Sequence, residues 1–210
     1  MFSVIFPGQG SQIVGMGKEL HSKFDIVKKL FKEADETLGF SLSNIILEGS
    51  KEELDLTENT QPAIFLMSYA IFKLTKDEFN INLNKADYFA GHSLGEYSAL
   101  ACAGSLSFSE TLKILKIRGK AMQESVPKGQ GGMVAILGST ISIIESMLKE
   151  NSNKYLCFIA NDNSEGQIVV SGNNEDLEKL MIDLKSRNIK NIKLPVSAPF
   201  HCNLMNKATQ

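Results

Sequence analysis

The sequence predicts an α/β protein in which a small βαββαβ unit is inserted into a larger α/β domain. Three observations support this prediction. An apolar, strand-like segment leads into Gly91-His92-Ser93-Leu94-Gly95, and a helix rich in small residues follows. One proline and three glycines within residues 127–132 mark a boundary. Beyond that boundary, short strand patterns alternate with helical ones, which indicates a second structural unit.

The first predicted strand covers residues 3–6 and is followed by a glycine-rich segment, residues 7–12, which we call the glycine loop. A dinucleotide-binding loop would need glycine at the position of Ile13, and a P-loop would need lysine at the position of Met16. Both phosphate-binding patterns therefore fail. Two interpretations remain open. The loop is either an ordinary turn between strand and helix, or a loop whose backbone N–H groups face a developing negative charge.

The next segments are predicted to be helical. Hydrophobic spacing predicts one amphipathic helix over residues 18–38, which Gly39 ends. Residues 41–58 indicate short helical turns and loops. Pro62 stands near the start of a further helix, which is expected to run from Thr60 to about residue 74.

Residues 91–95 match the pattern Gly-x-Ser-x-Gly, which is typical of the sharp turn that presents a serine above an α/β sheet. We call this segment the elbow. Residues 87–90 supply a strand before it, and residues 96–103 supply a helix after it. Glycines are favoured because this turn is strained and must leave the serine accessible. The pattern predicts that Ser93 is a nucleophile, and the alternative is a serine that only caps a helix.

A second chemically informative residue is Arg118. Ser107 and Glu110 form a capping box that starts its helix. Arg118 shares a helix face with Leu115 and Met122, so its guanidinium is predicted to point toward the core. A buried arginine is costly unless it meets an anion. That anion is either a structural Asp or Glu, or a carboxylate ligand, which suits the planar donor geometry of arginine.

The segment after the boundary follows the order of a ferredoxin-like unit, and it predicts a small domain over residues 128–194. The larger domain is expected to comprise residues 1–127 and 195–210. The expected elements of the small domain are strands at 133–137, 155–160, 167–171 and 189–194, helices ending near 150 and spanning 173–187, and a loop at 161–166.

A serine nucleophile needs a base within hydrogen-bond reach. The chain has three histidines. His21 falls on a predicted surface helix and His92 lies inside the elbow, so His201 is the remaining candidate base. A purely structural role is the alternative for this residue.

Composition excludes several classes of protein. A net charge of −2 gives no indication of nucleic-acid binding. The three cysteines have neither metal-ligand spacing nor the pattern of a disulfide framework, so we expect no metal and reduced thiols. The N-terminus lacks a basic region, and Pro7-Gly8 interrupts its apolar stretch. We therefore expect no signal peptide, no membrane span and a cytoplasmic location.

Four segments taken together resemble malonyl-CoA:acyl carrier protein transacylases. They occur in the order of that family, and the resemblance covers all 210 residues. The segments are Phe6-Pro7-Gly8-Gln9-Gly10-Ser11-Gln12, residues 91–100 around Ser93, Arg118-Gly119-Lys120-Ala121-Met122-Gln123, and Pro199-Phe200-His201-Cys202.

The resemblance implies an α/β-hydrolase-like large domain with an inserted ferredoxin-like small domain. It implies ping-pong transfer of a malonyl group from malonyl-CoA to the phosphopantetheine thiol of acyl carrier protein, for fatty acid biosynthesis. The expected partners are the coenzyme A thioester and acyl carrier protein, without nucleic acid, membrane or cofactor. The protein is expected to be a monomer.

The resemblance also implies the roles of individual residues. Ser93 resembles the nucleophile and His201 the base that takes its proton and later returns one to the leaving thiol. Gln9 and Leu94 resemble the residues whose backbone N–H groups form the oxyanion hole. Arg118 resembles the residue that pairs with the malonyl carboxylate.

Three further residues are expected to bind substrate. Gln61 and Met122 are expected to line the same pocket, and Phe200 before the histidine is typical of domains that select malonyl over bulkier acyl groups. The resemblance further implies a C-terminal segment, absent from the 210 residues, that completes the sheet and supplies a backbone carbonyl to orient His201. Two alternatives remain open: a serine thioesterase or hydrolase, and an inactive acyl-CoA-binding fragment.

Overall fold

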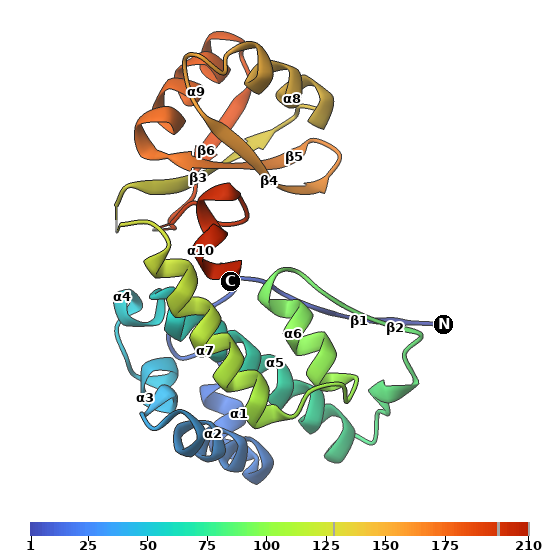
Figure 1. Cartoon of the computed structure of the whole chain (residues 1–210). Helices are drawn as coiled ribbons and strands as arrows, with labels where there is room; N and C mark the ends of the chain where they lie inside the picture. The colour runs from blue at the N-terminus through green and yellow to red at the C-terminus, as the bar shows by residue number, and fades with distance from the viewer. Residues whose placement is uncertain (128, 197, 210) are drawn as a thin grey trace. The chain divides into compact units, whose positions relative to one another are not determined.

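The computed structural model describes residues 1–127, 129–196 and 198–209. The chain divides into two compact units, Met1–Lys120 and Ala121–Gln210 (Figure 1). Each unit has its own hydrophobic core. The predicted domain boundaries, with residues 195–210 in the larger domain, stay a prediction.

Helices make up most of the first unit. Its core is formed by α2, α3, α5 and α7, and Phe31, Phe65 and Leu112 have no exposed surface there. The aromatic rings of Phe65 and Phe108 join α5 to the first turn of α7, with ring centroids 5.6 Å apart. The helices are α1 (Lys18–Lys23), α2 (Asp25–Leu38), α3 (Leu42–Leu47), α4 (Lys51–Leu54), α5 (Thr57–Asp77), α6 (Leu94–Cys102) and α7 (Phe108–Glu124), with the short 3-10 helix η1 (Leu83–Lys85). Only residues 108–120 of α7 belong to the first unit.

The prediction of a single helix over residues 18–38 is wrong. Phe24 has extended backbone angles, φ −119° and ψ 121°, and separates α1 from α2. Its N–H closes the first helix on the Leu20 carbonyl, and its own carbonyl accepts from Val27 to start the second. The hydrophobic spacing hides this break because both helices turn their apolar residues to the same core.

The predicted start of α5 at Thr60 is also wrong. The helix begins at Thr57, so Pro62 is its sixth residue rather than an early one. The Leu56 carbonyl accepts from the N–H groups of Asn59 and Thr60. The Thr60 hydroxyl donates to the Leu54 carbonyl across 2.6 Å, which ties the first turn of α5 to α4.

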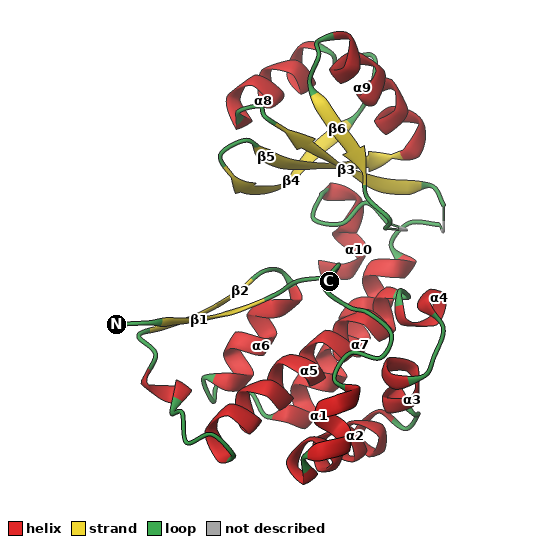
Figure 2. Ribbon diagram, turned by 180° about the vertical axis from the view of Figure 1, so that it is seen from behind, coloured by secondary structure: helices red, strands yellow, loops and turns green. Residues whose placement is uncertain are grey.

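Two parallel strands, β1 (Ser3–Phe6) and β2 (Tyr88–Gly91), form the sheet of the first unit. Figures 1 and 2 show them side by side, with α6 packed against them. Their register pairs Phe6 with Gly91 at the carboxyl ends. The glycine loop and the elbow therefore leave the sheet at the same end, which is where α/β folds place their sites.

The second unit has the predicted βαββαβ order, and its strands lie in the order β4-β5-β3-β6 with every pair antiparallel. Figure 2 shows α8 and α9 on one face of this sheet. The elements are β3 (Gly131–Leu137), α8 (Ile141–Glu150), β4 (Cys157–Ser164), β5 (Gln167–Asn173), α9 (Asn174–Ser186), β6 (Lys190–Lys193), the 3-10 helix η2 (Asn203–Met205) and α10 (Asn206–Thr209).

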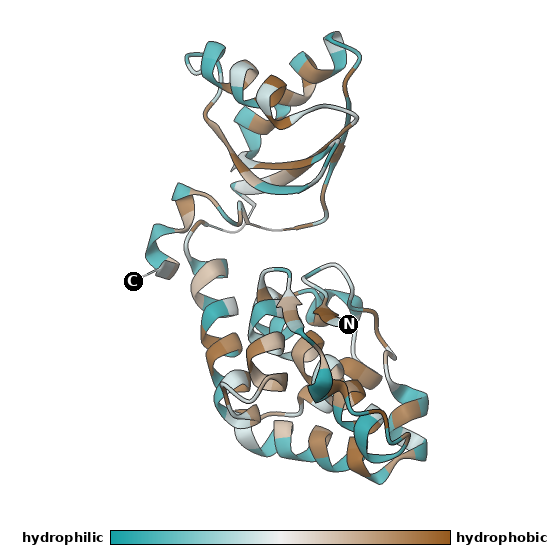
Figure 3. Ribbon diagram, turned by 90° about the vertical axis from the view of Figure 1, so that its right-hand side faces the viewer, coloured by the Kyte–Doolittle hydropathy of each residue, from teal (hydrophilic) through white to brown (hydrophobic). Residues whose placement is uncertain are grey.

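Strand β3 divides its side chains between two layers. Val134 and Ile136 belong to the core beneath α8 and α9, whereas Met133 and Ala135 pack in a separate cluster with Phe200. This alternation follows from the two-residue period of a strand. Figure 3 shows hydrophobic and hydrophilic stretches alternating along the helices, as expected for helices with one buried face.

One expected loop of the second unit is shorter than predicted. Strand β4 continues through the polar residues to Ser164, so only Glu165 and Gly166 connect it to β5. Gly166 has φ +79°, which a tight turn between strands requires. Among the described residues, no helix is long and apolar enough to cross a membrane.

Candidate active site

The elbow has the strand, turn and helix that the sequence predicts. Strand β2 ends at Gly91 and α6 begins at Leu94, so His92 and Ser93 alone make the turn. Ser93 is the N-cap of α6 and has φ 54° and ψ −110°, which is strained for a residue with a side chain. The surrounding structure holds this conformation, and the hydroxyl stands at the start of the helix.

The two glycines of the elbow are required by close packing. A Cβ atom on Gly91 would lie 1.9 Å from the carbonyl carbon of Gly95. A Cβ atom on Gly95 would lie 2.5 Å from the Phe6 carbonyl oxygen. Helix α6 can start against the end of β1 only because neither position has a side chain.

The glycine loop lies directly against the elbow. A Cβ atom on Gly8 would lie 2.6 Å from Nδ1 of His92, and the His92 N–H donates to the Phe6 carbonyl across 3.1 Å. Gln9, which is half-buried, follows Gly8 in this loop. Leu94 is the first residue of α6, so its N–H has no acceptor within the helix. The structure thus places both predicted oxyanion residues beside the elbow turn.

Arg118 reaches the elbow from α7. The next residue, Gly119, packs so closely on α5 that a Cβ atom there would lie 2.5 Å from the Thr57 carbonyl oxygen. This contact places Arg118 beside the fully buried Gln61. Arg118 donates from Nη1 to Gln61 Oε1 across 2.7 Å and from Nη2 to Ser93 Oγ across 3.1 Å. Three of the predicted residues therefore meet through one guanidinium.

The surroundings of Arg118 favour a role in binding an anion. Burial lowers the pKa of this guanidinium, although Tyr97 and Glu96 favour its charged form. An arginine in such a setting still keeps its charge. Within the described ranges, the structure shows no ion pair between Arg118 and an Asp or Glu, and the side chains that it contacts, Gln61, Ser93 and Tyr97, are neutral. The structure therefore favours the ligand interpretation over the structural salt bridge.

Sequence reasoning missed Tyr97. Its ring lies under the guanidinium of Arg118, with Cζ 5.5 Å from the ring centroid. Such cation–π contacts stabilise a cation that has lost part of its hydration. Tyr97 is four residues after Ser93 on α6, so the helical period would have placed it on the same face of the helix.

The other predicted residues lie in the second unit. Met122 and Phe200 are buried in the same cluster, and the Phe200 carbonyl accepts from the Ser171 hydroxyl across 2.6 Å. His201 follows with φ 58° and is exposed. It lines a cavity of about 370 Å³ together with residues of β4. Since Ser93 belongs to the first unit, its pairing with His201 as nucleophile and base stays a prediction.

A cavity in the first unit lies apart from these residues. It has a volume of about 760 Å³ and is lined mainly by apolar side chains of β1, the segment before α1, and α5. Neither Ser93 nor Arg118 lines it. Among the described residues, no cluster of His, Cys, Asp and Glu suited to a metal ion was found.

Comparison with known proteins identifies the family of the chain. Residues 3–210 match the family model described as the acyl transferase domain. The chain belongs to the acyl transferase domain family. Its match covers the elbow, the glycine loop, Arg118 and His201.

Named relatives of this acyl transferase domain are similar over almost its whole length. The malonyl CoA-acyl carrier protein transacylase of Haemophilus influenzae is 41% identical over 210 residues, which cover 100% of this chain and 67% of that protein. The protein of the same name from Bacillus subtilis strain 168 is 45% identical over 208 residues, which cover 98% of this chain and 64% of the relative. The chain thus spans only 64–67% of the length of these relatives.

Solved structures give the same result for the fold. The malonyl CoA-acyl carrier protein transacylase from Coxiella burnetii matches with a TM-score of 0.92 and 40% identity, over 99% of this acyl transferase domain and 65% of that chain. A malonyl-transacylase in complex with its type II PKS acyl-carrier protein matches with a TM-score of 0.92 and 39% identity, over 99% of this chain and 66% of its own. The predicted α/β fold class is therefore confirmed.

Proposed function

We propose that this acyl transferase domain transfers a malonyl group from malonyl-CoA to the phosphopantetheine thiol of acyl carrier protein, through an ester on Ser93. The observation that carries the proposal is the 3.1 Å contact between Arg118 Nη2 and Ser93 Oγ. It puts a binding group for a carboxylate beside the group that would attack a thioester. A plain thioesterase for neutral acyl chains has no use for a half-buried cation at this position.

The proposed first half-reaction makes the ester on Ser93. Ser93 Oγ attacks the thioester carbonyl while His201 accepts its proton. The negative charge on the carbonyl oxygen is stabilised by the backbone N–H groups of Gln9 and Leu94. The C–S bond then breaks, and His201 returns the proton to the coenzyme A thiolate. A malonyl ester of Ser93 remains.

Arg118 accounts for the selection of malonyl. The malonyl carboxylate is one methylene group from the thioester carbonyl, so its partner must lie next to the nucleophile. A bound carboxylate takes over the hydrogen bond from Nη2 that Ser93 Oγ accepts in the structure. Gln61 continues to hold Nη1 and fixes the plane of the guanidinium.

In the second half-reaction, the phosphopantetheine thiol of acyl carrier protein gives its proton to His201, and its sulfur attacks the ester carbonyl. The bond between this carbonyl carbon and Ser93 Oγ then breaks, Oγ takes the proton back from His201, and malonyl-carrier protein leaves. The names of the similar proteins and the solved complex with an acyl-carrier protein support this choice of partner. We also propose that the protein is a cytoplasmic monomer that acts in fatty acid biosynthesis and needs no cofactor.

The test is the intact mass of the chain after incubation with malonyl-CoA. We expect an increase by one malonyl group in the unaltered chain and no increase in Ser93→Ala. Thermal unfolding of both proteins shows whether each is folded. A folded chain without an adduct would favour the acyl-CoA-binding alternative.

Product analysis then separates transfer from hydrolysis. With acyl carrier protein present, we expect malonyl-carrier protein to form faster than free malonate. Free malonate at the same rate with and without carrier protein would identify a thioesterase.

A further inference from the structure

Two hydrogen bonds inside the glycine loop fix two consecutive peptide groups. The Ser11 hydroxyl donates to the Gly8 carbonyl across 3.0 Å. The Gly10 N–H donates to Gln12 Oε1 across 2.8 Å. Gly10 has φ +109°, a conformation open mainly to glycine, which lets the chain fold back so that residues 11 and 12 reach these groups.

These bonds determine where the Gln9 N–H points. The Gly8 carbonyl and the Gln9 N–H belong to the same planar, trans peptide group, so they point in opposite directions. Ser11 holds the carbonyl side of that group. Gln12 holds the N–H of the next peptide group, between Gln9 and Gly10. With both neighbouring planes held, the direction of the Gln9 N–H is set.

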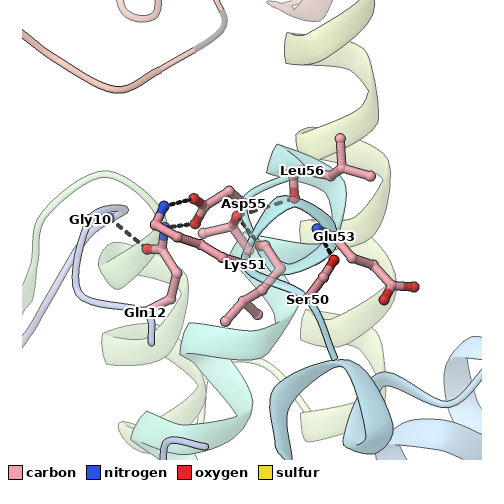
Figure 4. A network of polar contacts seen from close by, with 9 residues as sticks. Gly10, Gln12, Ser50, Lys51, Glu53, Asp55 and Leu56 are labelled. Carbon is pink, nitrogen blue, oxygen red and sulfur yellow. Dashed lines mark hydrogen bonds and ion pairs between the residues drawn. The ribbon is translucent and has the colours of Figure 1, made fainter. Parts of the chain in front are cut away.

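Gln12 is in turn anchored outside the loop. Its Nε2 donates to Asp55 Oδ1 across 2.8 Å, and Lys51 forms an ion pair with the other oxygen of Asp55 (Figure 4). Partial burial raises the pKa of Asp55, but hydrogen bonds from Lys51 and Gln12 outweigh this and hold the pKa below the usual carboxyl value. An ionised carboxylate only accepts hydrogen bonds. The Gln12 amide must therefore turn its nitrogen to Asp55 and its oxygen to Gly10.

Hydrogen bonds at both ends of α4 hold Asp55 in place. It closes α4, where its N–H donates to the Lys51 carbonyl across 2.9 Å, and Ser50 caps the other end of this helix (Figure 4). The next residue, Leu56, is the N-cap of α5, and Gln61 is the fifth residue of that helix. Asp55, which holds the glycine loop through Gln12, and Gln61, which accepts from Arg118, thus lie only six positions apart in one continuous segment.

We propose that Gln12 and Asp55 are positioning residues, which act through the glycine loop to aim the Gln9 N–H at the oxyanion of the reaction. Ser11 contributes to the same positioning from within the loop, through its hydrogen bond to the Gly8 carbonyl. The inference rests on the proposed function, because it needs an oxyanion at Gln9. It assigns a role to Asp55, which lies 43 positions after Gln12 and does not touch the reacting atoms.

The test exchanges the amide of Gln12 and the carboxylate of Asp55 between the two positions. In Gln12→Glu, two carboxylates face each other, and the loop must move to separate them. In Asp55→Asn, the amide oxygen can still accept from Gln12, so the change is mild. The double variant restores the pairing with reversed direction. The amide nitrogen introduced at position 55 donates to the carboxylate introduced at position 12, and that carboxylate still accepts from Gly10. Gln167→Glu, on an exposed residue of β5, is the control for the added charge.

The readout is single-turnover release of coenzyme A, normalised to the amount of Ser93 adduct finally formed. We expect Gln12→Glu to lower the maximal acylation rate about 10- to 100-fold, below the effect of losing an oxyanion donor entirely. The Kd for malonyl-CoA should not change, since ground-state binding does not use this N–H. The acylation rate of the double variant should recover to within about 5-fold of the rate of the unaltered chain. The control variant Gln167→Glu should have the same acylation rate as the unaltered chain.

Other outcomes separate this inference from the proposed function. An adduct on Ser93 that forms at the same normalised rate in Gln12→Glu would overturn the positioning role alone. A double variant no faster than Gln12→Glu would do the same, because the loss would then not depend on the pairing. A folded, unaltered chain that forms no Ser93 adduct would overturn both.

Discussion

The guanidinium of Arg118 donates to the hydroxyl of Ser93 across 3.1 Å, from a different helix and 25 positions further along the chain. Burial, Gln61 and the Tyr97 ring hold the cation at this place before any substrate arrives. The oxygen expected to attack and the cation expected to bind the substrate's carboxylate are therefore set relative to each other by the first unit itself.

Removal of the Arg118 side chain should affect malonyl-CoA more than acetyl-CoA. A charge-assisted hydrogen bond to a carboxylate contributes about 1.5–3 kcal/mol, which corresponds to a loss of about 10- to 100-fold in acylation rate by malonyl-CoA for Arg118→Ala. Acetyl-CoA lacks the carboxylate, so its rate should change less. Acylation rates measured with both thioesters check the prediction. Arg187→Ala, on an exposed residue of the second unit, is the control.

The same variant tests how water is excluded. We hypothesise that Arg118 fixes the malonyl ester where water attacks it poorly, so Arg118→Ala should raise hydrolysis relative to transfer. The ratio of free malonate to malonyl-carrier protein measures this. An unchanged ratio, or equal loss with malonyl-CoA and acetyl-CoA, would contradict the assigned role.

The substitution Gln61→Glu should weaken the binding of malonyl-CoA. The new carboxylate would lie where Oε1 of Gln61 now accepts from Arg118, at 2.7 Å, and would compete with the malonyl carboxylate for the cation. We expect the Kd for malonyl-CoA to rise about 10- to 100-fold, with a smaller effect on acetyl-CoA. Equilibrium binding to the variant in a Ser93→Ala background measures this without reaction. Gln61→Met, which keeps a similar shape without the charge, is the matched control, and equal weakening in both would argue against competition.

The strained backbone of Ser93 should be visible in stability. With φ 54° and ψ −110°, a side chain at this position costs about 1–3 kcal/mol relative to a favoured conformation. Ser93→Gly should therefore be more stable than Ser93→Ala by about 1 kcal/mol. Both variants lose the hydrogen bond from Arg118, so their difference isolates the backbone. Urea unfolding at neutral pH measures it, and an alanine variant at least as stable as the glycine variant would count against strain.

Asp183 should make the second unit sensitive to acid. Hydrogen bonds from Lys154 and Tyr155, together with the charge of Lys154, hold the pKa of this carboxyl below its ordinary value of 3.8. A depressed pKa in the folded state contributes stability above the unfolded pKa, and this contribution is lost as the pH falls through the folded pKa. Asp183→Asn should thus be less stable than the unaltered chain at pH 7. The difference should shrink below about pH 4.

Urea unfolding of both proteins across this pH range checks the prediction. Asp162→Asn, which changes an exposed carboxyl of β4, is the control. A difference for Asp183→Asn that stays constant down to the lowest pH would show that shape, and not charge, is responsible.

The elbow could be predicted from sequence because its requirements are local. Two glycines must flank Ser93 within five residues, and the strand and helix on either side have their own short patterns. The capping box of α7 is equally local, and it forms as predicted between Ser107 and Glu110. Arg118 could be placed on the core side because a helix period fixes which neighbours share its face.

The remaining features depend on contacts between distant segments. Phe24 breaks a helix without changing the hydrophobic spacing, so no pattern reports the break. The early start of α5 depends on the bond from Thr60 back to Leu54 in another helix. Asp55 and Gln12 meet only once α4 and the glycine loop are both in place. A single sequence has no signal for such a pair.

The absence of side-chain room at Gly91 and Gly95 limits how this protein can be re-engineered. Random changes at these positions would remove the turn rather than alter selectivity, so libraries that include them would yield mostly unfolded chains. Gln61 and Tyr97 are better positions for substitution, because they contact Arg118 through their side chains and not through the backbone. A search for variants that accept other acyl groups should vary these two positions together with Arg118 and leave the turn around Ser93 unchanged.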